Sequence, residues 1–312
     1  MTDQQRPVLE AGLSAEEGKI TARPYRPVRA FCRRVARNKL AVAGGLVVIL
    51  FFVVAVSFWL LSLADVRWPH DPDATQVEAK LSSPSRSHPL GTDHLGRDVL
   101  SRMLHGSRIS LTVGFVAVGV SVVLGVLVGS VAGYFGRWVD MLLMRCVDVM
   151  MCFPRFFLVL TVVALLKPNF WNVILVIGLT GWTGTSRLVR AEMLSLRARD
   201  FVVAAEALGA RRRRVMFVHM LPNALAPVLV SATLGVAGAI LLESGLSFLG
   251  FGVQPPRPTW GNILADGRLY ILDAWWMTLF PGLAILVTVL AFNLFGEGLR
   301  DALSARRGPE SR

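Results

Sequence analysis

The side chains best suited to polar chemistry lie together near residue 90. The segment HPLGTDHLGRDVLSRMLHGSRISL, residues 88–111, contains three histidines and two nearby aspartates: His88, His94, His105, Asp93 and Asp98. Imidazole and carboxylate groups at short spacing can bind a transition metal or exchange protons near neutral pH. A nickel-binding cluster is one interpretation of the histidines, and histidines on a helix surface are the commoner one. We follow the second and predict no metal site.

No nucleotide-binding or hydrolase motif accompanies these groups. A phosphate-binding loop of the form G-x-x-x-x-G-K-[ST] is absent, because the only Gly-Lys pair, at Gly18 and Lys19, is followed by Ile20. Neither H-E-x-x-H nor G-x-S-x-G occurs. We therefore expect no catalytic residues and no cofactor in this chain.

The segment near residue 90 also has the signals of a short amphipathic helix. Asp93 is a suitable N-cap and Gly106 a suitable stop, so we expect a helix that ends at His105. Asp98 and Arg102 stand four residues apart in the favourable acid-first order. One apolar face is formed by Leu95, Val99 and Met103.

A second segment, FVVAAEALGARRRRVMFVHMLPN at residues 201–223, joins a small apolar helix to four arginines. Asp200 can cap the start of this helix, and Gly209 can supply a left-handed residue past its end. Between them an apolar stripe has helical spacing: Phe201, Ala204, Ala205 and Leu208. A helix this short is unstable alone, so the stripe must be buried against something.

Beyond Gly209 we expect a second helix from Arg211 to Leu221, which ends at Pro222 where the next apolar run begins. Three interpretations fit this pair of helices. It is a connector whose stripe faces lipid, a basic surface for nucleic acid, or a docking element that a cytoplasmic partner receives.

The composition is that of a membrane protein with several spans. Hydrophobic residues make up 54% of the chain, charged residues 17%, and the mean hydropathy is +0.55. We expect an all-α fold with six spans of the length that a bilayer requires. The six apolar runs cover residues 40–63, 109–135, 138–166, 168–186, 224–242 and 274–296.

Basic residues indicate the orientation of these spans. If the N-terminus is inside, the inner segments hold 22 of the 33 lysines and arginines, and the outer segments hold nine. Inner flanks retain positive charge, so both termini are predicted to be cytoplasmic. The net charge of +12 follows this membrane pattern, and we expect no nucleic-acid partner.

A few charges fall inside the predicted spans, where ionisable groups are costly. The third span contains Asp140, Arg145 and Asp148, and Glu243 lies near the outer end of the fifth. A structural ion pair that joins the third span to its neighbours is favoured over a proton relay or substrate site. For Glu243 we likewise favour a structural role over a gating role.

The predicted layout begins with a cytoplasmic tail, residues 1–38, mostly disordered and then basic. The first span covers 39–66, and a periplasmic loop with an amphipathic helix covers 67–108. A five-helix core covers 109–303 and includes a cytoplasmic loop at 190–223. A second tail covers 304–312.

The cytoplasmic loop resembles a known signature. A-A-x-x-x-G followed by L-P-N, which includes Ala204, Ala205, Gly209, Leu221 and Pro222, is similar to the loop of the membrane subunits of bacterial ABC importers. In that family the loop forms coupling helices that seat on ATPase subunits. The family often begins this motif with Glu. Here that place holds Val203, and a glutamate follows at Glu206.

The outer segment carries a more specific resemblance. L-G-T-D-x-x-G-R-D-V-L-S-R resembles the second membrane subunit of the dipeptide, oligopeptide and nickel importers. Its signature positions are Gly91, Thr92, Asp93, Gly96, Arg97 and Asp98. With further similar stretches, the resemblance covers roughly residues 39–303.

The resemblance implies a type I importer permease in the bacterial cytoplasmic membrane. The implied partners are a second homologous permease, two ATPase subunits that bind ATP and Mg, and a periplasmic substrate-binding protein. It leaves the substrate open among dipeptides, oligopeptides, nickel complexes and other solutes. An ion-driven secondary transporter and a membrane scaffold without transport are the alternatives.

Overall fold

The computed structural model describes residues 35–64 and 68–304. Within these ranges the regular structure is helical, apart from one isolated bridge between Thr92 and Asp98. The two predicted tails, 1–38 and 304–312, lie almost entirely outside the described residues. The α-helices are α3 (Lys39–Leu63), α4 (Val99–Phe135), α5 (Arg137–Met151), α6 (Arg155–Leu165), α7 (Phe170–Arg197), α8 (Asp200–Ala207), α9 (Arg212–Arg214), α10 (Leu221–Phe248), α11 (Trp260–Gly267) and α12 (Trp276–Ser304). Shorter turns are η1 (Val77–Ala79), η2 (Val215–Met220) and η3 (Arg268–Tyr270).

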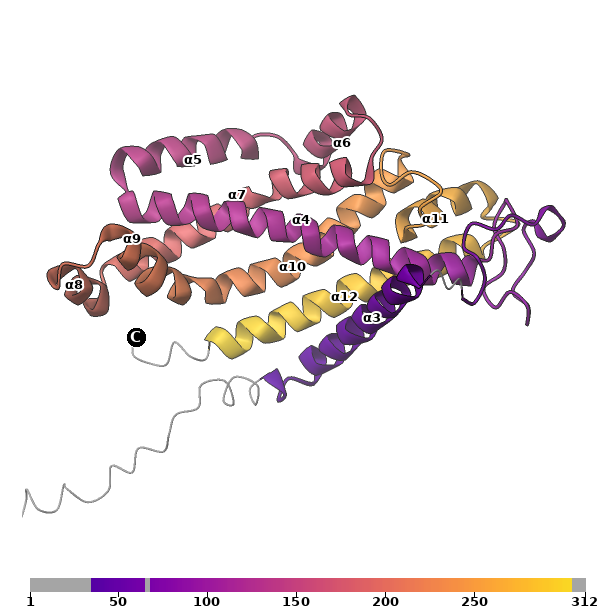
Figure 1. Ribbon diagram of the computed structural model, residues 1–312, viewed down its shortest axis with the longest axis horizontal. Helices are drawn as coiled ribbons and strands as arrows, with labels where there is room; N and C mark the ends of the chain where they lie inside the picture. The colour runs from indigo at the N-terminus through magenta and orange to yellow at the C-terminus, as the bar shows by residue number, and fades with distance from the viewer. Residues whose placement is uncertain (1–34, 65–67, 305–312) are drawn as a thin grey trace, which may run out of the picture.

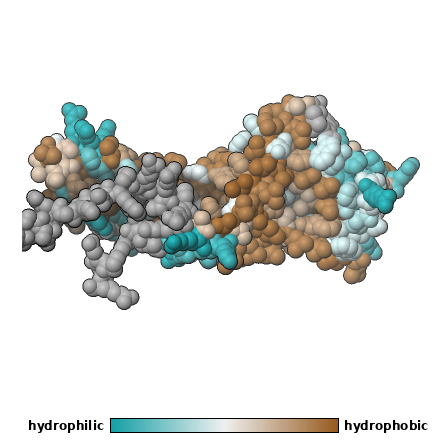
Figure 2. Space-filling model, turned by 90° about the horizontal axis from the view of Figure 1, so that it is seen from below, coloured by the Kyte–Doolittle hydropathy of each residue, from teal (hydrophilic) through white to brown (hydrophobic). Residues whose placement is uncertain are grey.

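The helices form an elongated bundle (Figure 1). α8 and α9 lie at one end, which we call the α8 end, and α11 lies at the other, which we call the α11 end together with the segment 68–98. Figure 2 shows a broad hydrophobic surface between hydrophilic side chains. It is the surface expected of a helix bundle that faces hydrocarbon along its flanks.

By length and composition, four helices in the described residues could cross a membrane: Lys39–Leu63, Val99–Phe135, Arg212–Phe248 and Trp276–Leu303. α5 and α6 pass the same test only as a pair, which raises the number to five. The six spans predicted from the sequence are not reached. The run at 168–186 lies in α7, whose second half carries glycine, threonine and arginine in place of aliphatic residues.

α4 and α7 pack closely along much of their length because α4 presents small residues to α7. A Cβ added at Gly125 would lie 2.6 Å from the Cβ of Thr185, and one at Gly129 would lie 2.4 Å from the carbonyl oxygen of Ser186. Four-residue spacing of glycines lets two helix backbones approach in a membrane. The close approach of the two helices therefore depends on the missing side chains at these glycines, while buried apolar residues of both helices pack on either side of them.

α4 corrects the prediction of a separate outer helix. The helix begins at Val99, with Asp98 as its N-cap, and continues without a break to Phe135. Gly106 does not stop it, and Asp93 does not cap it. The Asp98 side chain accepts a hydrogen bond from the Ser101 N–H, 2.8 Å long, so the start of the helix is set five residues later than expected.

The third predicted span is broken. α5 and α6 meet at an angle of 81° across the residues between Met151 and Arg155. Pro154 is the N-cap of α6, and a proline disfavours helical geometry at the residue before it. The apolar run at 138–166 is therefore two helices, and not one continuous span.

The second expected cytoplasmic helix is also different. Arg212–Arg214 is a short helix that passes into a π-helical turn at η2 and then into α10. Pro222 lies in the first turn of α10, directly after the π-helical turn, and it ends no helix. The four-arginine run is thus joined to a span without a loop.

Candidate functional site

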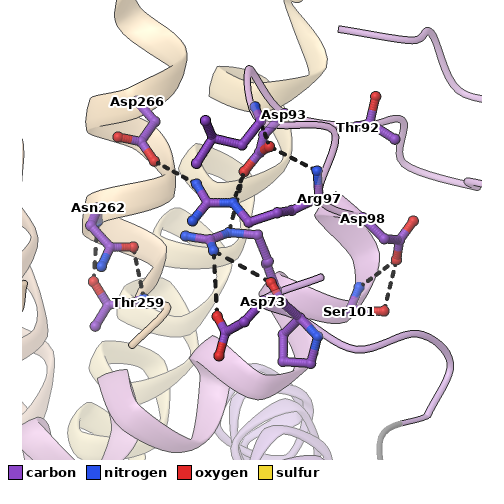
Figure 3. Close-up of polar contacts among 12 residues, drawn as sticks. Asp73, Thr92, Asp93, Arg97, Asp98, Ser101, Thr259, Asn262 and Asp266 are labelled. Carbon is purple, nitrogen blue, oxygen red and sulfur yellow. Dashed lines mark hydrogen bonds and ion pairs between the residues drawn. The ribbon is translucent and has the colours of Figure 1, made fainter. Parts of the chain in front are cut away.

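Asp93 is the centre of a buried polar cluster at the α11 end (Figure 3). Its carboxylate accepts hydrogen bonds from the backbone N–H groups of Leu95 and Arg97, at 2.8 and 2.9 Å. The Nε atom of Arg97 donates to the second oxygen at 2.6 Å, and Nε of Arg102 lies 3.7 Å from that oxygen. Asp93 and Arg102 are each 1% exposed. Charges buried to this degree are stable only when paired, so the cluster holds its own loop in place.

The same cluster ties the loop to α11. Nη2 of Arg97 lies 3.6 Å from the carboxylate of Asp266 in α11. Burial raises the pKa of Asp266 above its usual value, while the nearby charges of His94 and Arg102 act in the opposite direction. The start of α11 is itself fixed, because Thr259 and Asn262 form a reciprocal capping box.

Two tryptophans complete this attachment. Nε1 of Trp276 donates to the carbonyl oxygen of Thr92 at 3.1 Å, and Nε1 of Trp260 donates to the carbonyl oxygen of Met103 at 3.1 Å. Both indoles are buried. The bond from Trp276 joins the loop to α12, and the bond from Trp260 joins α11 to α4.

The backbone conformation at residues 91 and 96 requires glycine at both positions. Their φ values are +75° and +77°, a conformation that residues with a Cβ rarely adopt. A Cβ at Gly96 would lie 1.8 Å from the carbonyl oxygen of Gln76, and one at Gly91 would lie 2.6 Å from Nε1 of Trp276. The signature glycines therefore serve close packing.

The predicted ion pair between Asp98 and Arg102 is wrong. Asp98 caps α4 and accepts a hydrogen bond from the Ser101 hydroxyl at 2.8 Å, and His88 Nδ1 lies 2.9 Å from its other oxygen. Arg102 instead turns toward Asp93 and lies 4.0 Å from Asp73. Local spacing suggested the pair, but the N-cap position of Asp98 and the long-range partners of Arg102 prevent it.

The three histidines of this region, His88, His94 and His105, do not form one cluster. His94 stacks on Tyr270, with ring centroids 5.7 Å apart, and His105 meets the edge of Phe58 at 5.1 Å. His88 faces Asp98 and, across the loop, His70. His70 was not predicted to belong to this region, because only the fold brings it near residue 88.

At the α8 end, the apolar stripe lies open. Among the residues of α8, all of which the structure describes, Val202 alone is buried. Phe201 is 42% exposed and Leu208 is 88% exposed, while Ala204 is exposed and Ala205 is partly buried. The stripe is therefore largely open within the described part of this chain.

The opposite side of α8 is firmly attached. Val202 belongs to a buried cluster with Met193 from α7 and with Val215 and Met220 from η2. α8 begins at Asp200, with Arg199 as its N-cap, so Asp200 lies in the first turn and does not cap it. Gly209 has the predicted left-handed geometry, with φ of +77°.

The other residues of the loop signature lie apart from the stripe. Leu221 and Pro222 belong to the first turn of α10, beyond α9 and η2. Asn223 donates from its side chain to the carbonyl oxygen of His219 at 2.8 Å. The two halves of the loop signature therefore lie at α8 and at the start of α10, and α9 and η2 connect these two helices.

A pocket of about 560 Å³ opens beside α8. The hydroxyl of Tyr134, near the end of α4, donates to Glu206 at 3.4 Å across this region. The pocket is lined mostly by basic and aromatic residues: Tyr134, Phe135, Arg137, Arg197, Glu206, Ala210 and Arg212. The hydrogen bond between Tyr134 and Glu206 places the end of α4 directly against α8.

Ion pairs join α5 to α7. Arg190 binds both carboxylate oxygens of Asp140, one of them at 2.6 Å, and Arg187 donates to Asp148 at 2.6 Å. Arg145 lies 3.8 Å from Asp148, as the spacing suggested. The partners on α7 were missed, although they stand three residues apart and so share a helix face.

Glu243 lies in α10 and is fully buried. Its Oε1 accepts a hydrogen bond from the hydroxyl of Ser247, 2.7 Å away, one turn further along the helix. This places the carboxyl group inside the bundle beside α11 and away from lipid.

Comparisons with known proteins agree with this architecture. Residues 125–308 match the family described as the binding-protein-dependent transport system inner membrane component. Residues 27–84 match the N-terminal TM domain of oligopeptide transport permease C. The two matches together include the predicted loop at 190–223 and the first helix, α3.

Individual relatives are similar over almost the whole chain. The dipeptide transport system permease protein DppC of Alkalihalophilus pseudofirmus is 40% identical over 307 residues, which cover 98% of each chain. The di/tripeptide transport system permease protein DppC of Pseudomonas aeruginosa is 41% identical over 286 residues, 90% of this chain and 92% of that one. A putative peptide permease protein of Brucella suis is 40% identical over 284 residues, 90% of this chain and 91% of that one.

Proposed function

The chain belongs to the family of binding-protein-dependent transport system inner membrane components, and from this premise we propose that it is the permease subunit of a peptide importer. The relatives named for dipeptide and di/tripeptide transport support peptides as the substrate class. Its several apolar helices make it a multi-pass protein of the inner membrane.

We propose six spans with both termini in the cytoplasm. α7 is the remaining span in this arrangement, because its 28 residues reach about 42 Å, enough to cross a bilayer core. Its polar half packs against the glycines of α4, so it needs less apolar surface than a helix that faces lipid. The excess of arginine and lysine in the predicted inner segments supports the orientation.

In this arrangement the α8 end is cytoplasmic, and α8 couples the permease to an ATPase. The observation that carries this role is the contrast between the two sides of one short helix. Val202 is buried against α7 and η2, whereas Phe201 and Leu208 are exposed. A helix anchored on one side and apolar on the other is suited to docking in a partner's groove.

Movement of α8 would pass directly into the bundle. η2 continues into α10 without a loop, and Arg199 is two residues past the end of α7. Closure of two docked ATPase subunits would therefore tilt these helices between inward-open and outward-open states. ATP and Mg would be bound by those subunits, and this chain would form the path with a second homologous permease. A periplasmic binding protein would deliver the substrate.

The decisive experiment places one charge on each side of α8 in the reconstituted importer. Ala205→Glu puts a carboxylate into the stripe, and we expect it to abolish ATPase activity stimulated by the loaded binding protein. Val203→Glu is the matched control, because Val203 is exposed and points away from the stripe. It should leave the stimulation within about twofold of the original chain, a difference of only about 0.4 kcal/mol.

Normal stimulation in the Ala205→Glu complex would overturn the coupling role of α8. Co-purification separates the alternatives. An ATPase that arrives with the original chain and is lost with Ala205→Glu supports the importer, whereas a chain that transports with no ATPase present would be a secondary transporter.

A further inference from the structure

We propose that His70, His88 and Asp98 bind one divalent transition-metal ion of the zinc type at the α11 end. One ligand atom from each residue lies within 4.8 Å of the other two. The three residues come from separate segments: the loop after α3, the turn before the Gly91 signature, and the N-cap of α4. The inference is independent of the proposed role of α8.

The distances suit a tetrahedral ion after a small adjustment. His88 Nδ1 lies 2.9 Å from Oδ1 of Asp98, and His70 Nδ1 lies 3.9 Å from Oδ2 of Asp98. Ligand atoms about 2.1 Å from a tetrahedral zinc stand about 3.4 Å apart, and the two distances, each to a different oxygen of Asp98, lie on either side of that value. The two imidazole rings already face one another, with centroids 5.2 Å apart and an angle of 38° between their planes. With one ligand atom from each residue, the three atoms lie within 4.8 Å of one another, so a bound ion would draw them closer by up to about 1.4 Å.

Each ligand is held by neighbouring groups. The backbone N–H of His70 donates to the hydroxyl of Ser101 at 3.1 Å, and that hydroxyl donates to Asp98 at 2.8 Å. The backbone N–H of His88 donates to the hydroxyl of Ser85 at 3.2 Å. These hydrogen bonds hold the backbone of both histidines and the carboxylate of Asp98 in position before an ion arrives, and groups that position the ligands of a metal site raise its affinity.

The donor set and its exposure define the class of ion. Two imidazoles and one carboxylate suit zinc, copper or nickel, whereas magnesium and calcium prefer oxygen ligands only. The side chains of His70, His88 and Asp98 are 44%, 14% and 2% exposed. A bound ion would therefore face solvent on the His70 side, with a water molecule in the fourth position.

The test uses the full chain, with any affinity tag removed and with metals stripped by a chelator. Zn²⁺ is titrated by calorimetry, and Co²⁺ absorption reports tetrahedral coordination. We expect one ion per chain at micromolar concentrations. His70→Ala should weaken binding at least tenfold, the loss that even a substitution outside the ligand set commonly causes. His70 is half exposed, so its loss should leave the fold intact.

His94→Ala is the matched control. His94 is in the same region but stacks on Tyr270 and lies outside the group formed by His70, His88 and Asp98, so this variant should bind Zn²⁺ like the original chain. The absence of stoichiometric Zn²⁺ binding would overturn the site, and so would unchanged binding by His70→Ala. Competition by millimolar Mg²⁺ would overturn the assignment to a transition metal.

Discussion

The α11 end and the α8 end each carry a sequence signature, and the two signatures use their side chains in opposite ways. At the α11 end, Asp93 and Arg97 are buried and bound to each other. At the α8 end, Leu208 is 88% exposed, and the stripe on which it lies is largely open among the described residues. The difference teaches that a signature can mark either a self-contained packing unit or a surface kept free for another molecule, and that burial distinguishes the two.

The largest effect should come from removing the centre of the α11 cluster. Asp93→Ala leaves Arg97 and Arg102 buried without their shared carboxylate. Breaking a buried ion pair in this way typically costs about 3–5 kcal/mol, so we expect a marked loss of folded protein in membranes. Thermal unfolding of the purified chain measures the effect.

Asp73→Ala is the control for that prediction, because the Asp73 carboxylate is 48% exposed and 4.0 Å from Arg102. It should change stability by less than about 1 kcal/mol. Equal effects of the two substitutions would mean that the cluster at the α11 end is not a packing unit.

A pair of glycines sharpens the comparison, because they share a backbone conformation and differ in surroundings. Gly96 and Gly209 both have φ of +77°, but a Cβ at Gly96 would meet the backbone of Gln76 at 1.8 Å, whereas one at Gly209 would meet no described atom within 4 Å. Gly209→Ala should cost about 1 kcal/mol of backbone strain. Gly96→Ala should cost more than about 3 kcal/mol, because the clash adds to that strain. If chemical denaturation gives equal losses, packing at residue 96 is looser than the structure shows.

The smallest effect on stability is expected on the stripe itself. Leu208→Ser should change the free energy of unfolding by less than about 0.5 kcal/mol, because the side chain is exposed. Its loss should appear instead as weaker association with the ATPase in co-purification. Val202→Ser, one residue past Phe201 on the buried side, should cost about 2 kcal/mol because it leaves an unpaired hydroxyl in the cluster. A stripe substitution that destabilises the chain as much as Val202→Ser would contradict the open surface.

Local signals in the sequence predicted much of the fold. The apolar runs at 40–63 and 274–296 correspond to α3 and α12, because uninterrupted aliphatic residues leave little alternative in a bilayer. The helix at 201–208 and its left-handed stop at Gly209 were also predicted, since both follow from spacing and one glycine. The coupling role of the stripe stays a prediction.

Contacts between distant residues could not be predicted in this way. The partners of Asp140 and Asp148 come from α7, 50 and 39 residues away along the chain. The apolar run at 138–166 gave no sign that the chain bends by 81° between α5 and α6. The hydrophobic pattern likewise could not show that α4 starts at Val99, because its first turns are polar and are stabilised by α11. The grouping of His70 with His88 and Asp98 also depends on contacts between distant residues, so the sequence could not predict it.

α4 runs as one unbroken helix from Val99 to Phe135. Its 37 residues form a rod about 55 Å long. Asp98 caps one end of the helix at the α11 end, and at the other end the hydroxyl of Tyr134 donates to Glu206. A rigid rod of that length turns a tilt of about 5° into a displacement of about 5 Å at its far tip. We therefore expect a tilt at one end of α4 to appear at its other end as a change of position, without any unwinding of the helix.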